Sequence, residues 1–237
     1  MHNSNIVSLF DMTGNMVRPL ANQGYQCYCF DIQNENALEH CENGGTILYL
    51  QADLLDKDWQ EQIMQLDPRL LFAFPPCTDL AVSGAGHFKT KELANPNYRR
   101  EAMELVYIAR DLGEAIGCPY MIENPVSVIS SEWRKPDYIF HPFEYGGYLP
   151  EGDVHPLWPE YIVARDAYKK RTCLWVGNGF VMPEVDIVSP INADSATYQK
   201  LGGKSLKTKN IRSATPRGFA IAVSMFNPRD YYVQSSN

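Results

Sequence analysis

The sequence has no run of about 18 to 20 apolar residues, the length that a membrane-spanning helix needs. Its first residues also lack the basic and apolar regions of a secretory signal peptide. Hydrophobic residues nevertheless make up 45% of the 237-residue chain, enough to bury one substantial core. We therefore expect a soluble, cytoplasmic protein without membrane contact, folded as a single domain over residues 1–237.

The six cysteines lack the short paired spacing of a structural zinc site or of a secreted disulfide framework. Cys27 and Cys29 alternate along one expected strand and face the same side, but no second pair of ligands follows them. We therefore expect reduced thiols and no bound metal ion.

Acidic residues outnumber basic ones by 28 to 21, and the net charge of −7 argues against a surface that follows duplex DNA throughout. No acidic residue lies between Asp194 and Asp230, however. The cations of this part of the chain form a basic strip of Lys200, Lys204, Lys207, Lys209, Arg212, Arg217 and Arg229. The strip is either a solvated loop or a phosphate-binding one, with Lys204, Lys207 and Lys209 as candidate contacts.

Short apolar runs alternate with amphipathic stretches over most of the chain, a pattern that predicts an α/β fold with a mostly parallel sheet. The expected strands are 5–10, 26–32, 47–51, 70–74, 120–122, 137–140 and 172–176. The expected helices are 16–22, 56–66, 97–116 and 216–225. Residues 178–211 show no clear periodicity and predict a loop or short irregular insertion.

Two residues that suit covalent chemistry follow neighbouring expected strands. Cys77 ends a Pro-Pro-Cys loop at the carboxyl end of one strand, where open α/β sheets bind ligands, and Glu123 ends the next. A thiolate that adds to C6 of a pyrimidine and an acid that hydrogen-bonds N3 let charge accumulate at C5. Each residue alone also fits a structural role, as a buried cysteine after a turn or a carboxylate that accepts backbone hydrogen bonds.

The first strand is followed by Phe-Asp-Met-Thr-Gly at residues 10–14, a tight glycine turn that can receive the amino-acid part of a nucleoside cofactor. Asp31, at the end of the second strand, is placed to accept hydrogen bonds from ribose hydroxyls. Asp53, after the third strand, is placed to accept one from an adenine amine. Each of these residues is, on its own, more often a cap or turn residue.

Taken in order, these segments resemble the cytosine-C5 DNA methyltransferase family. The resemblance rests on residues 10–14, Asp31, Asp53, Pro75-Pro76-Cys77, Glu123-Asn124, Lys170-Arg171-Thr172 and a closing helix at 215–223. It implies a Rossmann-like, S-adenosylmethionine-dependent methyltransferase fold. By that likeness Cys77 is the nucleophile, Glu123 is the acid at N3, and Arg171 contacts the base or positions the cysteine loop.

The resemblance also implies the cofactor site and a moving segment. The residues that would bind S-adenosylmethionine are Phe10, Thr13, Gly14, Asp31, Ile32, Asp53, Leu54 and Pro75. Residues 78–87 would form a mobile loop over the substrate, with Gly84 and Gly86 as hinges.

Three features depart from the family pattern. Met12 and Asn15 replace glycines of the cofactor turn, and Lys170-Arg171-Thr172-Cys173 replaces a Gln-x-Arg-x-Arg strand. Only residues 178–211 stand where family members carry a large target-recognition domain. Such compact relatives look like those of bacteriophages, which would place the protein in the host cytoplasm.

Three functional hypotheses follow. The first is methylation of cytosine in DNA with low sequence specificity, and the second is methylation of a free pyrimidine nucleotide, which needs no recognition domain. The third is a catalytically silent, cofactor-binding partner of another DNA-modifying protein, which the joint presence of Cys77 and Glu123 disfavours. The first two stay open, and no pattern indicates an oligomeric state or a target sequence.

Overall fold

The computed structural model describes residues 4–191, 201 and 205–227. Within these residues, eight strands form one sheet in the order β3-β4-β2-β1-β5-β6-β8-β7. The strands are β1 (Asn5–Leu9), β2 (Gln26–Asp31), β3 (Ala37–His40), β4 (Thr46–Gln51), β5 (Leu70–Ala73), β6 (Tyr120–Pro125), β7 (Tyr138–Phe140) and β8 (Thr172–Gly177). The five strands from β4 to β6 run parallel to one another, whereas β3 and β8 are antiparallel to their neighbours. The predicted α/β fold with a mostly parallel sheet is confirmed.

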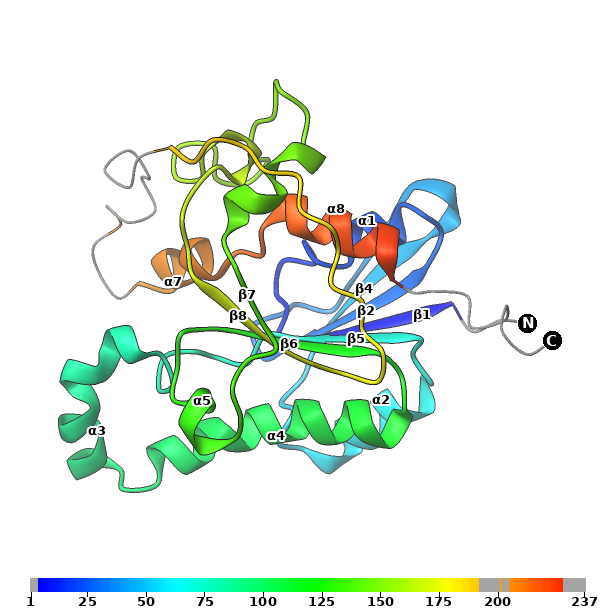
Figure 1. The fold of residues 1–237 in the computed structure, drawn as a ribbon. Helices are drawn as coiled ribbons and strands as arrows, with labels where there is room; N and C mark the ends of the chain where they lie inside the picture. Colours follow the sequence, from blue (N-terminus) through cyan, green and yellow to red (C-terminus); the bar gives the residue numbers. More distant parts are fainter. Residues whose placement is uncertain (1–3, 192–200, 202–204, 228–237) are drawn as a thin grey trace, which may run out of the picture.

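Helices cover both faces of this sheet. α1 (Arg18–Ala21) and α8 (Arg217–Phe226) lie on one face, and α2 (Lys57–Gln65) and α4 (Tyr98–Ile116) lie on the other (Figure 1). The remaining helical segments are α3 (Phe88–Ala94), α5 (Ile129–Glu132), α7 (Leu206–Ser213), η1 (Glu42–Gly44), η2 (Val82–His87), η3 (Pro142–Tyr148) and η4 (Ala164–Asp166). No helix among the described residues is long and apolar enough to cross a membrane.

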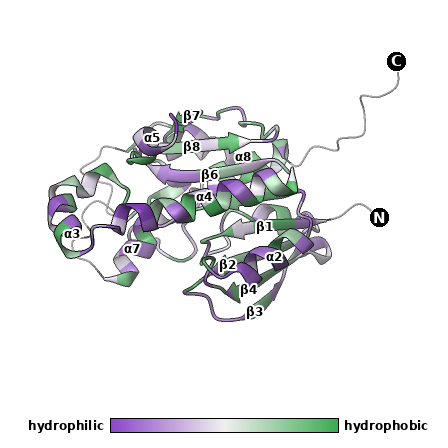
Figure 2. Cartoon of the chain, turned by 90° about the horizontal axis from the view of Figure 1, so that it is seen from below, coloured by the Kyte–Doolittle hydropathy of each residue, from purple (hydrophilic) through white to green (hydrophobic). Residues whose placement is uncertain are grey.

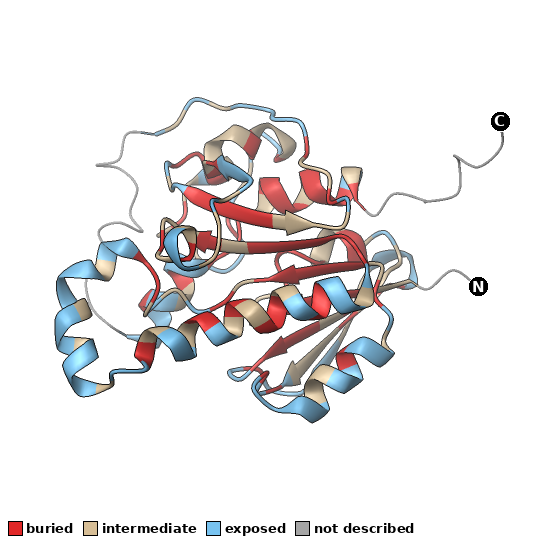
Figure 3. Cartoon of the chain, turned by 60° about the horizontal axis from the view of Figure 1, so that its bottom comes forward, coloured by how far each residue is buried: buried red, intermediate tan, exposed pale blue. Residues whose placement is uncertain are grey.

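The centre of the sheet is buried on both faces, which explains why β1 and β5 are almost continuously apolar. Side chains alternate along β1, so that Val7 packs in the cluster under α4 and Ile6 packs in the cluster under α8. The helices that cover the sheet mix hydrophilic and hydrophobic residues, and their outward surfaces are exposed while the central strands are buried (Figures 2 and 3).

Helix ends follow from local sequence signals. Gly117 ends α4 in the left-handed conformation, with φ of 78°, and the predicted end of this helix is confirmed. The Asp56 side chain caps α2 by accepting a hydrogen bond from the Asp58 backbone. Pro19 lies in the first turn of α1, where its missing N–H is tolerated because N–H groups of the first turn have no partner within the helix.

The structure differs from the predicted secondary structure at β3 and within residues 178–211. β3 was not expected, because it is an edge strand with little burial and therefore no apolar run. Residues 178–211 are not wholly irregular, because α7 begins after Ser205, whose side chain accepts from the Thr208 backbone. Residues 78–87 include η2, and their role as a mobile loop stays a prediction.

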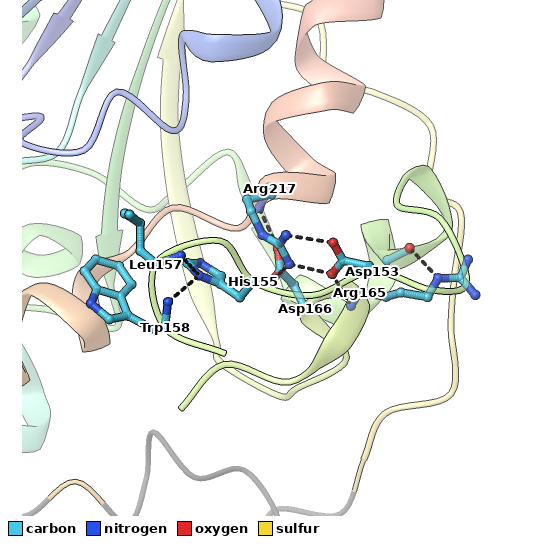
Figure 4. Close-up of polar contacts among 8 residues, drawn as sticks. Asp153, His155, Leu157, Trp158, Arg165, Asp166 and Arg217 are labelled. Atoms are coloured by element: carbon cyan, nitrogen blue, oxygen red, sulfur yellow. Dashed lines mark hydrogen bonds and ion pairs between the residues drawn. The ribbon is translucent and has the colours of Figure 1, made fainter. Parts of the chain in front are cut away.

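A buried ion cluster fixes residues 150–168 to the start of α8. The Arg217 guanidinium donates to both carboxylate oxygens of Asp153, at 2.8 and 2.6 Å, and to Asp166 at 3.0 Å (Figure 4). The Arg217 backbone N–H also donates to Asp166, at 2.6 Å. Buried charges are stable only when they are paired in this way, so the cluster has a structural role.

His155 lies beside this cluster and gives a testable pH dependence. Its Nδ1 accepts hydrogen bonds from the backbone N–H groups of Leu157 and Trp158, at 3.2 and 3.1 Å. Burial, with a further contribution from the Arg217 charge, lowers the His155 pKa to about 4. The unfolded chain therefore takes up a proton that the folded chain excludes, and stability present above about pH 6.5 is lost as the pH falls toward 4.

We predict that His155→Asn removes this dependence, because an asparagine oxygen accepts the same two hydrogen bonds without titrating. Between about pH 7 and pH 4.5, the wild-type free energy of unfolding should fall by about 2 to 3 kcal/mol more than that of the variant. Urea denaturation at the two pH values measures the difference. Equal losses in the two proteins would show that His155 does not titrate on unfolding.

Candidate active site

The strand order reverses between β1 and β5. From β1 the chain proceeds to β2 and β4 on one side, and from β5 it proceeds to β6 on the other. Open α/β sheets bind ligands outside the carboxyl ends of their strands at such a point. Residues 10–14 follow β1 and residues 75–77 follow β5, so both predicted segments lie there. Helices α3 and α7 lie beyond this end of the sheet (Figures 1 and 2).

The turn after β1 is built around Asp11, which sequence reasoning did not assign to the site. Its Oδ1 accepts from the backbone N–H groups of Thr13 and Gly14, at 3.0 and 2.8 Å, and its Oδ2 accepts from the Ser8 hydroxyl at 2.8 Å. Gly14 has φ of 65°, and a Cβ there would lie 2.5 Å from the Tyr49 hydroxyl oxygen. The backbone of Phe10 is also left-handed, with φ of 57°. The turn therefore requires the glycine at position 14.

The remaining predicted cofactor residues follow β2, β4 and β5. Asp31 is 8% exposed, and burial raises the pKa of its carboxyl, while the next residue, Ile32, is 62% exposed. Asp53 is exposed and accepts from the Leu55 backbone, whereas Leu54 is only 2% exposed and packs in the core. Pro75 is buried.

Asn34 connects these segments and was missed by sequence reasoning. Its Nδ2 donates to the carbonyl oxygens of Cys29, Leu50 and Asp11, at 3.0, 3.3 and 3.4 Å. One buried amide thereby joins β2 and β4 to the turn after β1. A lone asparagine in a loop carries no sequence signal for such a role.

The ends of β5 and β6 are joined by a second amide. Asn124 Nδ2 donates to the Pro75 carbonyl oxygen at 2.8 Å, and this contact brings the Cys77 loop to the strand end that carries Glu123. Three buried oxygens at this end of β6 have no hydrogen-bond partner among the described residues: Glu123 Oε1, Asn124 Oδ1 and Ser127 Oγ. Because an unpaired buried polar atom costs free energy, such a group is typical of a ligand site.

Electrostatic interactions show which charges lie near Cys77. Burial raises the pKa of the Cys77 thiol, the Glu123 charge raises it further, and the charges of Lys170 and Arg212 lower it. Burial also raises the pKa of Glu123, and Lys170 again opposes the shift. The isolated protein therefore favours a protonated thiol beside a carboxyl that holds its proton more tightly than usual.

The structure brings Lys170, rather than Arg171, to Cys77 and Glu123. Arg171 is exposed, and its charge acts on the thiol of Cys173. The register explains the difference: Leu174 lies opposite Glu123, and side chains alternate along β8, so residues an even number of positions from Leu174 share the face of Glu123. The sequence cannot supply that register.

Two further segments approach Cys77. Lys91 of α3 donates to the Thr78 carbonyl oxygen and to Asp79, both at 2.7 Å, and so holds the chain after Cys77. The predicted phosphate contacts Lys207 and Lys209 are exposed on α7, and Lys204 lies outside the described residues.

A separate cavity of about 620 Å³ lies between α3 and α4, against Tyr98, Met103 and Tyr107. None of the predicted site residues lines it. We locate the candidate site at the strand ends, because the unpaired polar groups and interacting charges gather there. Comparison with models of known protein families and with curated proteins found no match to this chain.

The charges around Cys77 predict its reactivity. Glu123→Gln removes a negative charge and should lower the thiol pKa, whereas Lys170→Gln removes a positive charge and should raise it. One pKa unit changes the thiolate fraction about tenfold. At about pH 8 we therefore expect alkylation to become roughly three- to tenfold faster in Glu123→Gln and slower by a similar factor in Lys170→Gln. Iodoacetamide labelling of the Cys77 peptide, followed by mass spectrometry, measures both rates.

Arg171→Gln is the matched control for Lys170→Gln, because it removes the same charge from the adjacent residue. We expect it to change the labelling rate of Cys77 much less. If the two variants slow labelling equally, the placement of Lys170 at the thiol is wrong.

Proposed function

We propose that the chain is an S-adenosylmethionine-dependent methyltransferase of the cytosine-C5 type, which acts through a covalent bond between Cys77 and C6 of the base. The observation that carries this proposal is the meeting of a thiol and an unpaired buried carboxyl oxygen at adjacent strand ends, with Lys170 acting on both. A catalytically silent module has no need for this costly arrangement.

The residues at the ends of β1, β2 and β4 fit the proposed cofactor. Asp31 and Asp53 supply acceptors for ribose hydroxyls and the adenine amine, and the exposed Ile32 offers an apolar surface beside them. Asn15 Nδ2 is buried without a partner and offers a donor for a carboxylate. The Asp11 carboxylate is excluded from this set, because it is already occupied by the turn.

The base is oriented by three side chains. C6 and N3 lie on opposite sides of a pyrimidine ring, so C6 at Cys77 places N3 toward Glu123. We place the Lys170 ammonium, whose charge acts on both residues, beside one of the two ring edges between those atoms. One edge carries the O2 carbonyl and the other carries the amino group, which is a donor, so the Lys170 ammonium donates to O2.

In the reaction, the Cys77 thiolate forms a bond to C6 and pushes electrons through the ring toward C5. Glu123 keeps a proton at N3, which its raised pKa favours, and this proton stabilises the charge that develops on the ring. S-adenosylmethionine, when bound, supplies the methyl group that C5 takes up. Transfer of the C5 proton to water then re-forms the C5–C6 double bond, breaks the C6–S bond and returns the thiolate.

We predict that Cys77→Ser abolishes turnover, by at least about 10³-fold, while it preserves the fold and cofactor binding, because a hydroxyl is a far weaker nucleophile than a thiolate. A 5-fluorocytosine acceptor should trap the wild-type protein as a covalent adduct visible by mass spectrometry, since fluorine cannot leave as a proton does. Cys41→Ser, at a thiol outside the site, is the control and should keep both properties. Wild-type turnover in Cys77→Ser would refute the mechanism.

We also predict that Asp31→Asn weakens S-adenosylmethionine binding about 10- to 100-fold, because it replaces a charge-assisted acceptor at the ribose with a neutral one. The asparagine can still accept the Gln33 backbone hydrogen bond that Asp31 accepts at 2.7 Å. Isothermal calorimetry measures the affinity, with Glu42→Gln as a control for the loss of one exposed charge. An unchanged affinity would exclude Asp31 from the cofactor site.

A further inference from the structure

Helix α7 is held over the candidate site by contacts on two sides. Ile211, together with Ala214 just beyond the helix, packs in a small apolar cluster with Ile162 and Tyr168. Asn210 Nδ2 contacts the Met12 sulfur at 3.2 Å, within the turn after β1. The helix therefore lies against that turn, at the same edge of the sheet as residues 75–77.

Arg212 is the residue of α7 whose charge reaches Cys77. Its charge lowers the pKa of the Cys77 thiol but is not among the charges that act on Glu123, whereas Lys170 acts on both. Arg212 is therefore nearer to Cys77 than to Glu123.

The guanidinium of Arg212 is exposed and makes no ion pair with an acidic residue among those the structure describes. Arg217, five positions later, is instead neutralised by Asp153 and Asp166. Lys207 lies 5.8 Å from the centre of the Tyr161 ring, and the charge of Lys209 is not among the main influences on the Cys77 pKa. Arg212 is thus the available cation that α7 brings to the thiol.

The geometry of a pyrimidine nucleotide indicates what this cation binds. In the common anti conformer, C6 faces the 5′-oxygen, so the 5′-phosphate lies near the carbon that the thiolate attacks and away from N3. A base with C6 at Cys77 and N3 at Glu123 therefore directs its 5′-phosphate to the side where Arg212 lies. A guanidinium matches the paired oxygens of a phosphate group.

We propose that Arg212 binds the phosphate on the 5′ side of the target pyrimidine. The proposal rests on the proposed function, because that function sets the orientation of the base. The same chemistry is offered by the terminal phosphate of a free nucleotide and by a phosphodiester of a DNA strand.

The test measures binding in a Cys77→Ser background, where no covalent bond forms and turnover is not needed. The ligands are deoxycytidine, deoxycytidine 5′-monophosphate and a dye-labelled single-stranded oligodeoxynucleotide with one cytosine. We expect Arg212→Gln to weaken binding of the phosphorylated ligand about tenfold or more, and to leave the affinity for deoxycytidine within about twofold. Arg212→Lys keeps the charge without the planar fork, so its affinity for the phosphorylated ligand should lie between those of the parent protein and Arg212→Gln.

Lys209→Gln is the matched control, because it removes one exposed charge from the same helix, and it should change each affinity by less than about twofold. An Arg212 effect on the monophosphate identifies a free nucleotide as the source of the phosphate, and an effect confined to the oligonucleotide identifies a strand.

Four results would overturn the proposal. They are equal effects of Arg212→Gln and Lys209→Gln, an equal loss of affinity for deoxycytidine, no change for either phosphorylated ligand, or no measurable binding of either phosphorylated ligand. Thermal melting of each variant excludes a loss of fold. The 5-fluorocytosine adduct separates the two proposals, because its absence removes the methyltransferase mechanism even where Arg212 binds phosphate.

Discussion

The buried hydrogen bond from Asn124 to the Pro75 carbonyl oxygen holds together the two strand ends on which the candidate chemistry depends. That carbonyl follows β5, where the sheet ladder no longer supplies a donor, and the 2.8 Å contact from Asn124 satisfies it. Successive side chains on a strand point to opposite faces, so Asn124 can bind the loop from one face of the sheet while the neighbouring Glu123 lies on the other face. The same strand end therefore fixes the cysteine loop and presents the carboxyl group.

This arrangement is not the most stable one available to the chain. Glu123 Oε1, Asn124 Oδ1 and Ser127 Oγ are buried without partners, and each such atom typically costs about 1 to 3 kcal/mol. The raised pKa values of Glu123 and Cys77 report the same cost, since burial disfavours the charged form of each group. Groups of this kind, gathered where open sheets bind ligands, are typical of a ligand site.

Much of the fold was accessible from the sequence, because buried parallel strands and amphipathic helices have distinct periodicities. The runs that became β1, β2, β4 and β5 carried that signal, and so did the stripe of α4. β3 carried no such signal, because most of its residues are exposed. α7 also carried none, because it buries only Thr208 and Ile211, and its stability comes from neighbours that are distant in sequence.

The candidate site was also predicted only in part. The sequence could predict that Cys77 and Glu123 lie at the same edge of the sheet, since they follow adjacent parallel strands. The sequence could not predict the choice between Lys170 and Arg171, because it depends on the register between β6 and β8. It also could not predict that the Leu54 side chain belongs to the core while the neighbouring Asp53 is exposed.

Folding places the cations of the basic strip in different environments, where they have different roles. Arg217 is buried and neutralised by two aspartates, so it holds residues 150–168 against α8 and adds nothing to the surface field. Lys207 lies over a tyrosine ring, whereas Arg212 keeps its charge beside the thiol. Among the described residues of the strip, folding therefore leaves Arg212 as the cation that acts on the thiol. Under the proposed function, such a cation suits an acceptor held by the phosphate next to the target base, and it contributes little to holding a long stretch of duplex, which needs many phosphate contacts.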